Sequence, residues 1–142
     1  MSFNLDESLG FLLNRAAHSM KWALEKKLAR HGLTPPQWAS LARLWEEDGL
    51  PQSQLGRRLH FDKPTISGII DRLETKGLVR RERDGEDKRV VRIFLAPKGK
   101  KLEKTLAGLA TGVNQKAGAG LSPAGLENLK AMLTRIFTNM RE

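Results

Sequence analysis

The residues of this sequence that could do chemistry are concentrated in residues 62–77, and they offer hydrogen bonds and positive charge to a polyanion. The polar positions of this segment carry cations, hydroxyls or small side chains: Lys63, Pro64, Thr65, Ser67, Gly68 and Arg72. Small polar side chains let a helix backbone approach a duplex closely, while hydroxyl and cationic groups reach base edges or phosphates. Apolar residues recur between them at helical spacing: Ile66, Ile69, Ile70 and Leu73. This spacing predicts a helix, capped by Asp62, with one face in a core. Taken alone, the segment fits a plain amphipathic helix equally well.

A hairpin with a basic loop is expected directly after this helix. The hydrophobic period changes from 3.6 to 2 after Gly77, so residues 78–82 and 90–95 are predicted to be strands. The loop between them is too polar to bury, and we expect Arg83 and Lys88 to contact phosphates. Helix, turn, helix and basic hairpin, in this order, is the arrangement of a winged helix-turn-helix. In that motif one helix enters the major groove and the wing reaches the backbone or the minor groove.

The net charge of +9 is concentrated on the same part of the chain. Residues 57–104 carry a net charge of +7, whereas residues 1–56 are neutral and residues 105–142 carry +2. A basic surface can serve solubility alone, but its coincidence with a groove-reading motif makes a polyanion partner the better explanation. We therefore expect Gln52, Ser53 and Arg57, on the preceding short helix, to contact phosphate as well.

Long helices at both ends of the chain must position this motif. Asn4 and Glu7 have the spacing of a capping box and Gly32 is placed as a stop, so a first helix is expected from residue 4 to 31. At 1.5 Å per residue it would be about 40 Å long. Thr34 is placed as the N-cap of a second helix that ends near residues 48–49.

The C-terminal third predicts a helix that begins at Pro97, breaks at residues 118–120 and is followed by a last helix capped by Ser122. The last helix is apolar on more than one face, so it is either a core helix or part of an interface. We favour a homodimer interface built from the first and last helices, because terminal helices with surplus apolar surface usually pair with a second copy. The residues expected to form it are Leu5, Leu9, Leu12, Leu126, Leu129, Leu133, Ile136, Phe137 and Met140.

Length and composition predict one domain of 142 residues. Its expected fold class is mainly α with a small antiparallel β-hairpin wing (α+β). Residues 33–96 would form the winged helix-turn-helix lobe, and residues 1–32 and 97–142 the dimerisation helices. The sequence has no cysteine, which excludes disulfides, thiolate metal sites and thiol redox sensing. A polar start and the lack of any apolar stretch near 18 residues predict a soluble, cytoplasmic protein associated with the nucleoid, with no membrane partner.

These motifs resemble those of the MarR family of bacterial transcription regulators. The similar segments are residues 33–38, Gln54-Leu55 and Leu59, residues 62–65, residues 73–79, and Asp87-Lys88-Arg89 at the wing. The most specific signature is Asp-x-Arg followed by an apolar strand and Lys98-Gly99, and the resemblance covers roughly residues 9 to 105. The family usually has a threonine where Ala96 stands. Its loss should weaken a helix cap by about 1 kcal/mol, which Pro97 partly offsets.

The resemblance implies an intertwined homodimer whose two recognition helices match a palindromic site, with half-sites about 34–36 Å apart. It also implies that Arg89 enters the minor groove, and Asp84 or Asp87 would orient it by a charge-assisted hydrogen bond. Repression is the commoner outcome in the family, and small aromatic or amphipathic effectors bind between the dimer helices and the reading head. The residues that could line such a pocket are Asn14, His18, Trp22, Trp38 and Arg43, although a histidine near two tryptophans is more often a packed core residue than a ligand group.

No enzyme is indicated by the sequence. There is no glycine-rich phosphate loop, the three histidines lack metal-ligand spacing, and the carboxylates are scattered, so neither a metal nor a cofactor is expected. We conclude that the chain is a sequence-specific double-stranded DNA-binding regulator, most consistent with a ligand-released repressor. The alternative is a sequence-nonspecific architectural DNA- or RNA-binding winged-helix protein without ligand control. Only the regulator should prefer its site over random duplex by about 10³-fold or more.

Overall fold

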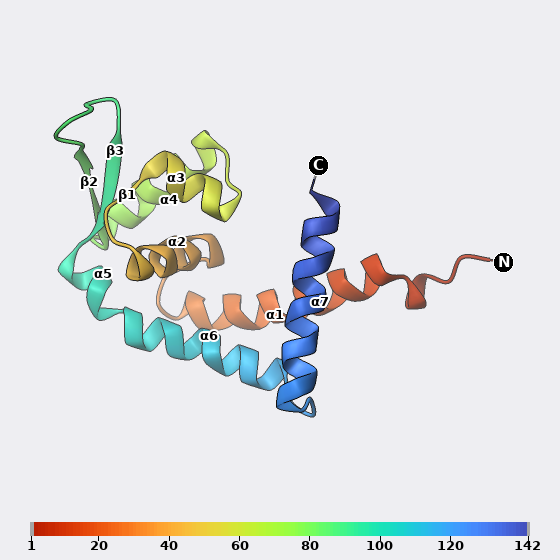
Figure 1. The fold of residues 1–142 in the computed structure, drawn as a ribbon. Helices are drawn as coiled ribbons and strands as arrows, with labels where there is room; N and C mark the ends of the chain where they lie inside the picture. Colours follow the sequence, from red (N-terminus) through yellow and green to blue (C-terminus); the bar gives the residue numbers. More distant parts are fainter. Residues whose placement is uncertain (1, 142) are drawn as a thin grey trace.

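The computed structural model describes residues 2–141 and shows a mainly helical chain with a small antiparallel sheet at one end (Figure 1). The elements are η1 (Leu5–Glu7, a 3-10 helix), α1 (Leu9–Ala29), α2 (Pro35–Glu46), β1 (Leu50–Pro51), α3 (Gln52–Leu59), α4 (Lys63–Thr75), β2 (Val79–Arg83), β3 (Val91–Leu95), α5 (Pro97–Lys101), α6 (Glu103–Ala117) and α7 (Pro123–Met140). Helices α2 to α4 and the sheet form a reading head. Helices α1 and α6 pack side by side and carry the chain away from the head, while α7 runs across α1 and approaches the head at its C-terminal end.

Helix capping in the head follows the sequence. The Thr34 hydroxyl accepts from the Gln37 amide at 3.3 Å, and the Gln37 side chain accepts from the Thr34 amide at 3.2 Å, which completes a capping box. The Asp62 carboxylate accepts from the Thr65 amide at 2.8 Å and so fixes the start of α4. Both predicted helix starts are therefore confirmed.

Two expected continuous helices are interrupted. The Asn4 side chain accepts from the Asp6 amide rather than from residue 7, so it caps only η1, and the extended Ser8 separates η1 from α1. The predicted single helix from residue 4 to 31 is therefore wrong. The helix that begins at Pro97 is likewise divided at Leu102 into α5 and α6. Just before that break the Gly99 carbonyl accepts from the Trp45 indole at 3.0 Å, a contact made 54 residues away in sequence.

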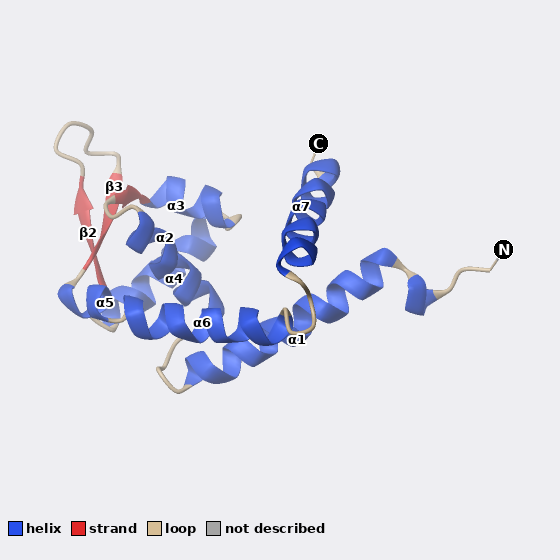
Figure 2. Cartoon of the chain, turned by 60° about the horizontal axis from the view of Figure 1, so that its bottom comes forward, coloured by secondary structure: helices blue, strands red, loops and turns tan. Residues whose placement is uncertain are grey.

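The wing belongs to a three-stranded sheet rather than to an isolated hairpin. The strand order is β1-β3-β2, with both pairs antiparallel and with Val79 opposite Leu95 and Arg83 opposite Val91. Figure 2 shows the loop between β2 and β3 projecting beyond the strands. The sequence did not predict β1, because a strand of two residues is too short to show a period of two.

The hydrophobic core lies inside the head and beneath it. Residues with almost no exposed surface come from α1 to α4, the sheet and α6: Leu28, Leu41, Leu44, Leu50, Leu55, Ile66, Ile70, Leu73, Ile93 and Leu106. The apolar face predicted for α4 is therefore confirmed. Helix α7, by contrast, has no buried residue. Among residues 2–141, no helix is long and apolar enough to cross a membrane.

Candidate nucleic-acid interface

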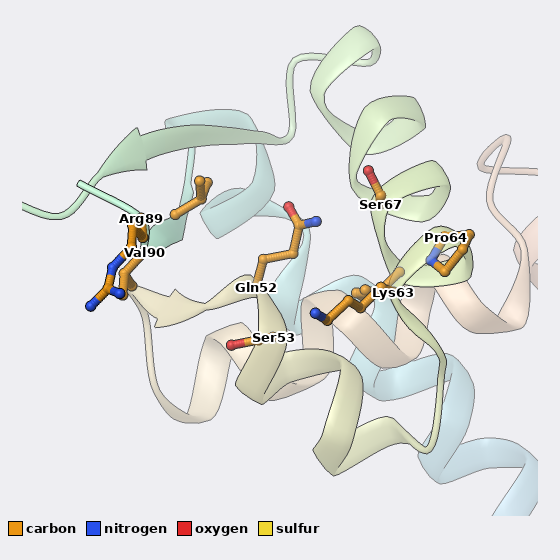
Figure 3. A pocket seen from close by; sticks show the side chains of 9 residues that line it. Gln52, Ser53, Lys63, Pro64, Ser67, Arg89 and Val90 are labelled. Atoms are coloured by element: carbon orange, nitrogen blue, oxygen red, sulfur yellow. The ribbon is translucent and has the colours of Figure 1, made fainter. Parts of the chain in front are cut away.

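A groove of about 470 Å³ lies between the start of α3, the start of α4 and the wing (Figure 3). Six of the twelve residues predicted to contact DNA line it: Gln52, Ser53, Lys63, Pro64, Ser67 and Arg89. These side chains come from three separate elements, and the helix-turn-helix places α3 and α4 so that their N-terminal ends open onto the same hollow. The walls offer hydroxyl, amide and cationic groups, which suit the phosphates and base edges of a duplex.

The outer face of α4 continues from this groove toward α2. Pro64, Thr65, Gly68 and Arg72 line a second, shallower depression of about 430 Å³ together with residues at the start of α2. A Cβ added at Gly68 would meet only the Arg72 guanidinium, at 3.4 Å, so nothing inside the chain requires glycine at this position. The open space over Gly68 is therefore available to an approaching partner.

The remaining predicted contacts lie outside both hollows. Arg57 is exposed on α3, and Lys88 is exposed at the tip of the wing. Arg83 donates to the Lys88 carbonyl at 2.8 Å. The structure therefore gives Arg83 a role in bracing the wing loop, in addition to the predicted phosphate contact.

Arg89 is held at the wing tip by Asp87. The two side chains share two hydrogen bonds of 3.1 Å, and the Asp87 carboxylate also accepts from the Arg89 amide at 3.0 Å. These bonds lower the pKa of Asp87 and raise the pKa of Arg89, so both groups stay charged at neutral pH. Because the Arg89 side chain is 91% exposed, it remains free to enter a groove. Of the two carboxylates that the sequence left open, Asp87 is the one that contacts Arg89.

Asp84 folds the loop that carries Arg89. Its carboxylate accepts from the Glu86 and Asp87 amides at 3.1 and 3.0 Å and from Arg92 Nε at 2.7 Å. Arg92 in turn donates to the Gly49 carbonyl at 3.0 Å and so ties the wing to β1. The hydrogen bond from Arg92, followed by those from the two amides, lowers the pKa of Asp84.

Sequence reasoning missed Arg92, and it also missed Arg81, which joins β2 to α4 and to Gln52. The signal that the sequence offered for these contacts was a set of arginines on the predicted strands, within a few residues of carboxylates. That signal shows no more than a charged strand face, because the partners of Arg81 lie 7 to 29 residues away.

Within residues 2–141, the five residues considered for ligand binding lie at several separate places, and the ligand site stays a prediction. Trp38 lines a cleft of about 260 Å³ between α2 and α6, and its indole N–H is buried without a hydrogen-bond partner in residues 2–141. Trp22 borders a different hollow between α1 and α6, with the Lys26 ammonium 4.0 Å from its ring centroid. Asn14 and His18 are exposed on α1, and Arg43 pairs with Glu46 at 3.3 Å.

Most residues expected at a dimer interface are exposed in the single chain. Leu5, Leu9, Leu12, Leu129, Leu133, Phe137 and Met140 are exposed, and Leu126 and Ile136 are half-buried. An apolar groove of about 690 Å³ runs between α1, α6 and α7, with Leu126, Leu129 and Leu133 along it. At the far end of α7 the Phe137 ring lies 5.6 Å from the His60 ring, at the turn between α3 and α4.

No group of three or more histidine, aspartate or glutamate side chains within residues 2–141 is arranged to hold a metal ion. What the head offers is therefore a basic, hydrogen-bonding groove with a protruding arginine, and nucleic acid is the partner that this chemistry fits.

Comparison with known proteins also indicates a protein that binds nucleic acid. Residues 33–91 match the model of the MarR family. The chain is 41% identical over 131 residues to the HTH-type transcriptional regulator TtmR of Methylorubrum extorquens (strain PA1), covering 91% of this chain and 67% of the relative. Its fold is similar to that of S. aureus MepR in a complex with DNA, with a TM-score of 0.87 and 29% identity over 94% of this chain and 98% of the other. It is also similar to the PcaV transcriptional regulator from Streptomyces coelicolor in complex with its natural ligand, with a TM-score of 0.88 and 26% identity over 99% of both chains.

Proposed function

We propose that this chain, which belongs to the MarR family of DNA-binding transcription regulators, represses transcription by binding a palindromic operator as a homodimer. A small aromatic or amphipathic effector releases the homodimer from the DNA. The observation that carries the operator proposal is the groove in which α3, α4 and the wing converge. Its polar residues come from all three elements, as a surface that reads base edges and holds phosphates requires.

Each predicted contact has a role in this proposal. Helix α4 enters the major groove, with Lys63, Thr65, Ser67 and Arg72 reaching bases or phosphates and with Gly68 allowing close approach. Arg89 enters the minor groove from the wing. The residues that hold phosphates on either side are Gln52, Ser53, Arg57, Arg83 and Lys88.

The homodimer proposal is supported by the apolar side chains that are exposed to solvent in a single chain. Apolar side chains of α7 face solvent, including Phe137 at 50% and Met140 at 77% exposure, and α1 adds Leu9 at 60%. Exposed apolar surface on this scale marks an interaction site. A two-fold partner would present a second α4 and so match a site with half-sites about 34–36 Å apart.

The effector proposal is supported by Trp38. Its buried indole N–H has no acceptor among the described residues, and the Trp38 side chain lines the cleft between α2 and α6. A ligand that opened this packing and placed a carboxylate or phenol oxygen on the N–H would satisfy that donor. Such a ligand must also prefer a spacing of the two α4 helices that does not fit the operator, because equal affinity for both spacings would shift nothing.

Selection of bound duplexes from a random pool tests the operator proposal. We expect a palindromic consensus, bound about 10³-fold or more tightly than a scrambled duplex at the same salt concentration. A basic winged helix that bound every duplex alike would instead be the architectural protein considered above.

Repeating the measurement with aromatic carboxylates tests the effector. We expect one of them to quench tryptophan fluorescence and release DNA over the same concentration range, with at least about a fivefold loss of operator affinity. Trp38→Phe, which removes the indole N–H, should weaken this response, whereas the control Trp22→Phe should keep it. Quenchers that all leave operator affinity unchanged would contradict ligand control.

A further inference from the structure

Arg81 connects the wing to the recognition helix through its whole guanidinium group. Its Nη1 donates to Asp71 at 2.6 Å and to Glu74 at 3.0 Å, and its Nη2 donates to the Ser67 carbonyl at 3.0 Å. Its Nε donates to the Gln52 side-chain oxygen at 3.0 Å. All three nitrogens are therefore engaged, and the side chain is only 23% exposed.

The contacts of Arg81 run along one side of α4. Ser67, Asp71 and Glu74 are spaced i, i+4 and i+7, so they form a single stripe on the helix. The buried apolar face of α4 packs on the core, and Thr65, Gly68 and Arg72 remain on the side that borders open space. Apolar packing is non-directional, whereas a planar guanidinium fixes the direction of its partners. The Arg81 guanidinium thus ties α4 to β2 through contacts of fixed direction.

Arg81 also orients Gln52, which lines the candidate groove together with Ser67 (Figure 3). Because the Gln52 amide oxygen accepts from Arg81, its NH₂ group is the part left to donate into the groove. A donor held in one direction can discriminate among acceptors on DNA, which a freely rotating amide does less well.

We infer that Arg81 is a positioning residue, which fixes α4, Gln52 and the wing in the one spacing that reads a specific sequence. This inference rests on the proposed operator binding. In this role Arg81 acts through the protein, because each of its nitrogens donates to a protein group. Loss of the Arg81 guanidinium should therefore lower the affinity for the specific sequence and leave the affinity for an unrelated duplex nearly unchanged.

Arg81→Lys is the decisive variant, because it keeps the charge and removes the fork that contacts four groups at once. Its matched control is Arg80→Lys on the same strand, since Arg80 points to the other face, pairs with Glu82 and stacks on Phe94 without contacting α4. The probes are a duplex selected by the parent protein and a scrambled duplex of the same length, each titrated at several salt concentrations.

We expect Arg81→Lys to lose at least about tenfold in affinity for the selected duplex, with its affinity for the scrambled duplex and its salt slope unchanged. The Arg80→Lys control should match the parent on both duplexes. An Arg81→Lys protein that discriminates as well as the parent would overturn the inference. A parent that fails to discriminate would instead overturn the proposed operator recognition.

Thermal unfolding of each variant separates positioning from loss of fold. If Arg81→Lys does not fold, Asp71→Asn decides, because Asp71 is 64% exposed and its amide oxygen can still accept from Arg81 without the charge. This variant should fold and show a smaller fall in the ratio of selected to scrambled affinity. Unchanged discrimination in a folded Asp71→Asn protein would then count against the role of Arg81.

Discussion

The reading head and helix α7 use their apolar residues in opposite ways. In the head, Leu41, Leu44 and Leu73 have no exposed surface, while in α7 no residue is buried. The head also closes its polar network internally, through Arg81, Arg92 and the caps of α2 and α4. The head thus buries its core within one chain, whereas α7 leaves an apolar face exposed, which we propose a second copy covers. We therefore expect substitutions in the head to change recognition alone, and substitutions in α7 to change assembly and, through it, DNA affinity.

The largest effect is expected at the exposed face of α7. Leu133→Glu places a charge in the proposed interface, so the protein should become monomeric and lose about 10²-fold or more in operator affinity, because the linkage of two heads is lost. Sedimentation and DNA titration measure the two effects. Thr138→Glu is the control, since it lies roughly 140° around the helix from Leu133 and is also exposed. A folded, monomeric Leu133→Glu protein that binds operator like the parent would remove the need for a dimer.

The next effect is expected at the wing. Arg89→Ala should weaken operator binding by roughly 5- to 150-fold, while the dimer and the melting temperature stay unchanged. The reason is that Arg89 contacts only Asp87 within the described chain and is otherwise exposed. Arg30→Ala, at the end of α1, is a control that removes one positive charge from a residue that does not line the groove. Equal affinity of Arg89→Ala and the parent at the same salt concentration would show that the wing does not contact DNA.

A smaller effect, opposite in sign for stability and for binding, is expected at Gly68. Gly68→Ala should raise the free energy of unfolding by about 0.5–1 kcal/mol, since alanine is favoured over glycine inside a helix and the chain has room for the methyl group. Operator affinity should fall nonetheless, because the methyl group occupies the space left for DNA. Gly108→Ala in α6, where an added Cβ meets nothing within 4 Å, should gain stability without losing affinity. Unchanged operator affinity of Gly68→Ala would show that DNA does not approach α4 closely at Gly68.

The smallest effect is the response of the head to acid. Hydrogen bonds from Thr65 lower the pKa of Asp62, and those from Arg92 and two loop amides lower the pKa of Asp84, from an ordinary value of 3.8. A lowered pKa contributes stability at pH values above 3.8, and this contribution is lost as the pH falls through the lower folded value. Unfolding measured against pH should therefore be flat near neutrality and decline below about pH 4. Asp84→Asn should make the decline shallower; an unchanged profile would mean that the Arg92 contact does not persist in solution.

Local patterns in the sequence predicted much of the head. The spacing of Ile66, Ile69, Ile70 and Leu73 gave α4 and its buried face, and Thr34 and Asp62 gave two helix starts. These features depend on neighbours within four residues, which a sequence shows directly. The basic loop and its Asp87-Arg89 pair could be predicted for the same reason, because the two residues are two positions apart in the sequence.

Features that depend on distant partners were missed or wrong. Strand β1 exists only because Leu50 and Pro51 pair with β3, some 40 residues later. The break between α5 and α6 accompanies a bond from Trp45. The ligand site of five residues is neither confirmed nor contradicted and stays a prediction, because spacing along α1 does not show which hollow each side chain borders.

The sequence by itself determined the helix-turn-helix, the wing, the charge and the surplus apolar face of α7, because each is written in composition or in a period of two to four residues. Only the tertiary structure decided how α3, α4 and the wing converge on one groove and which residues hold them there. Arg81 reaches partners on α3 and α4, and Arg92 reaches the turn before β1. The physical reason is that a long, charged side chain can satisfy its donors with many possible acceptors, and only the folded chain selects among them.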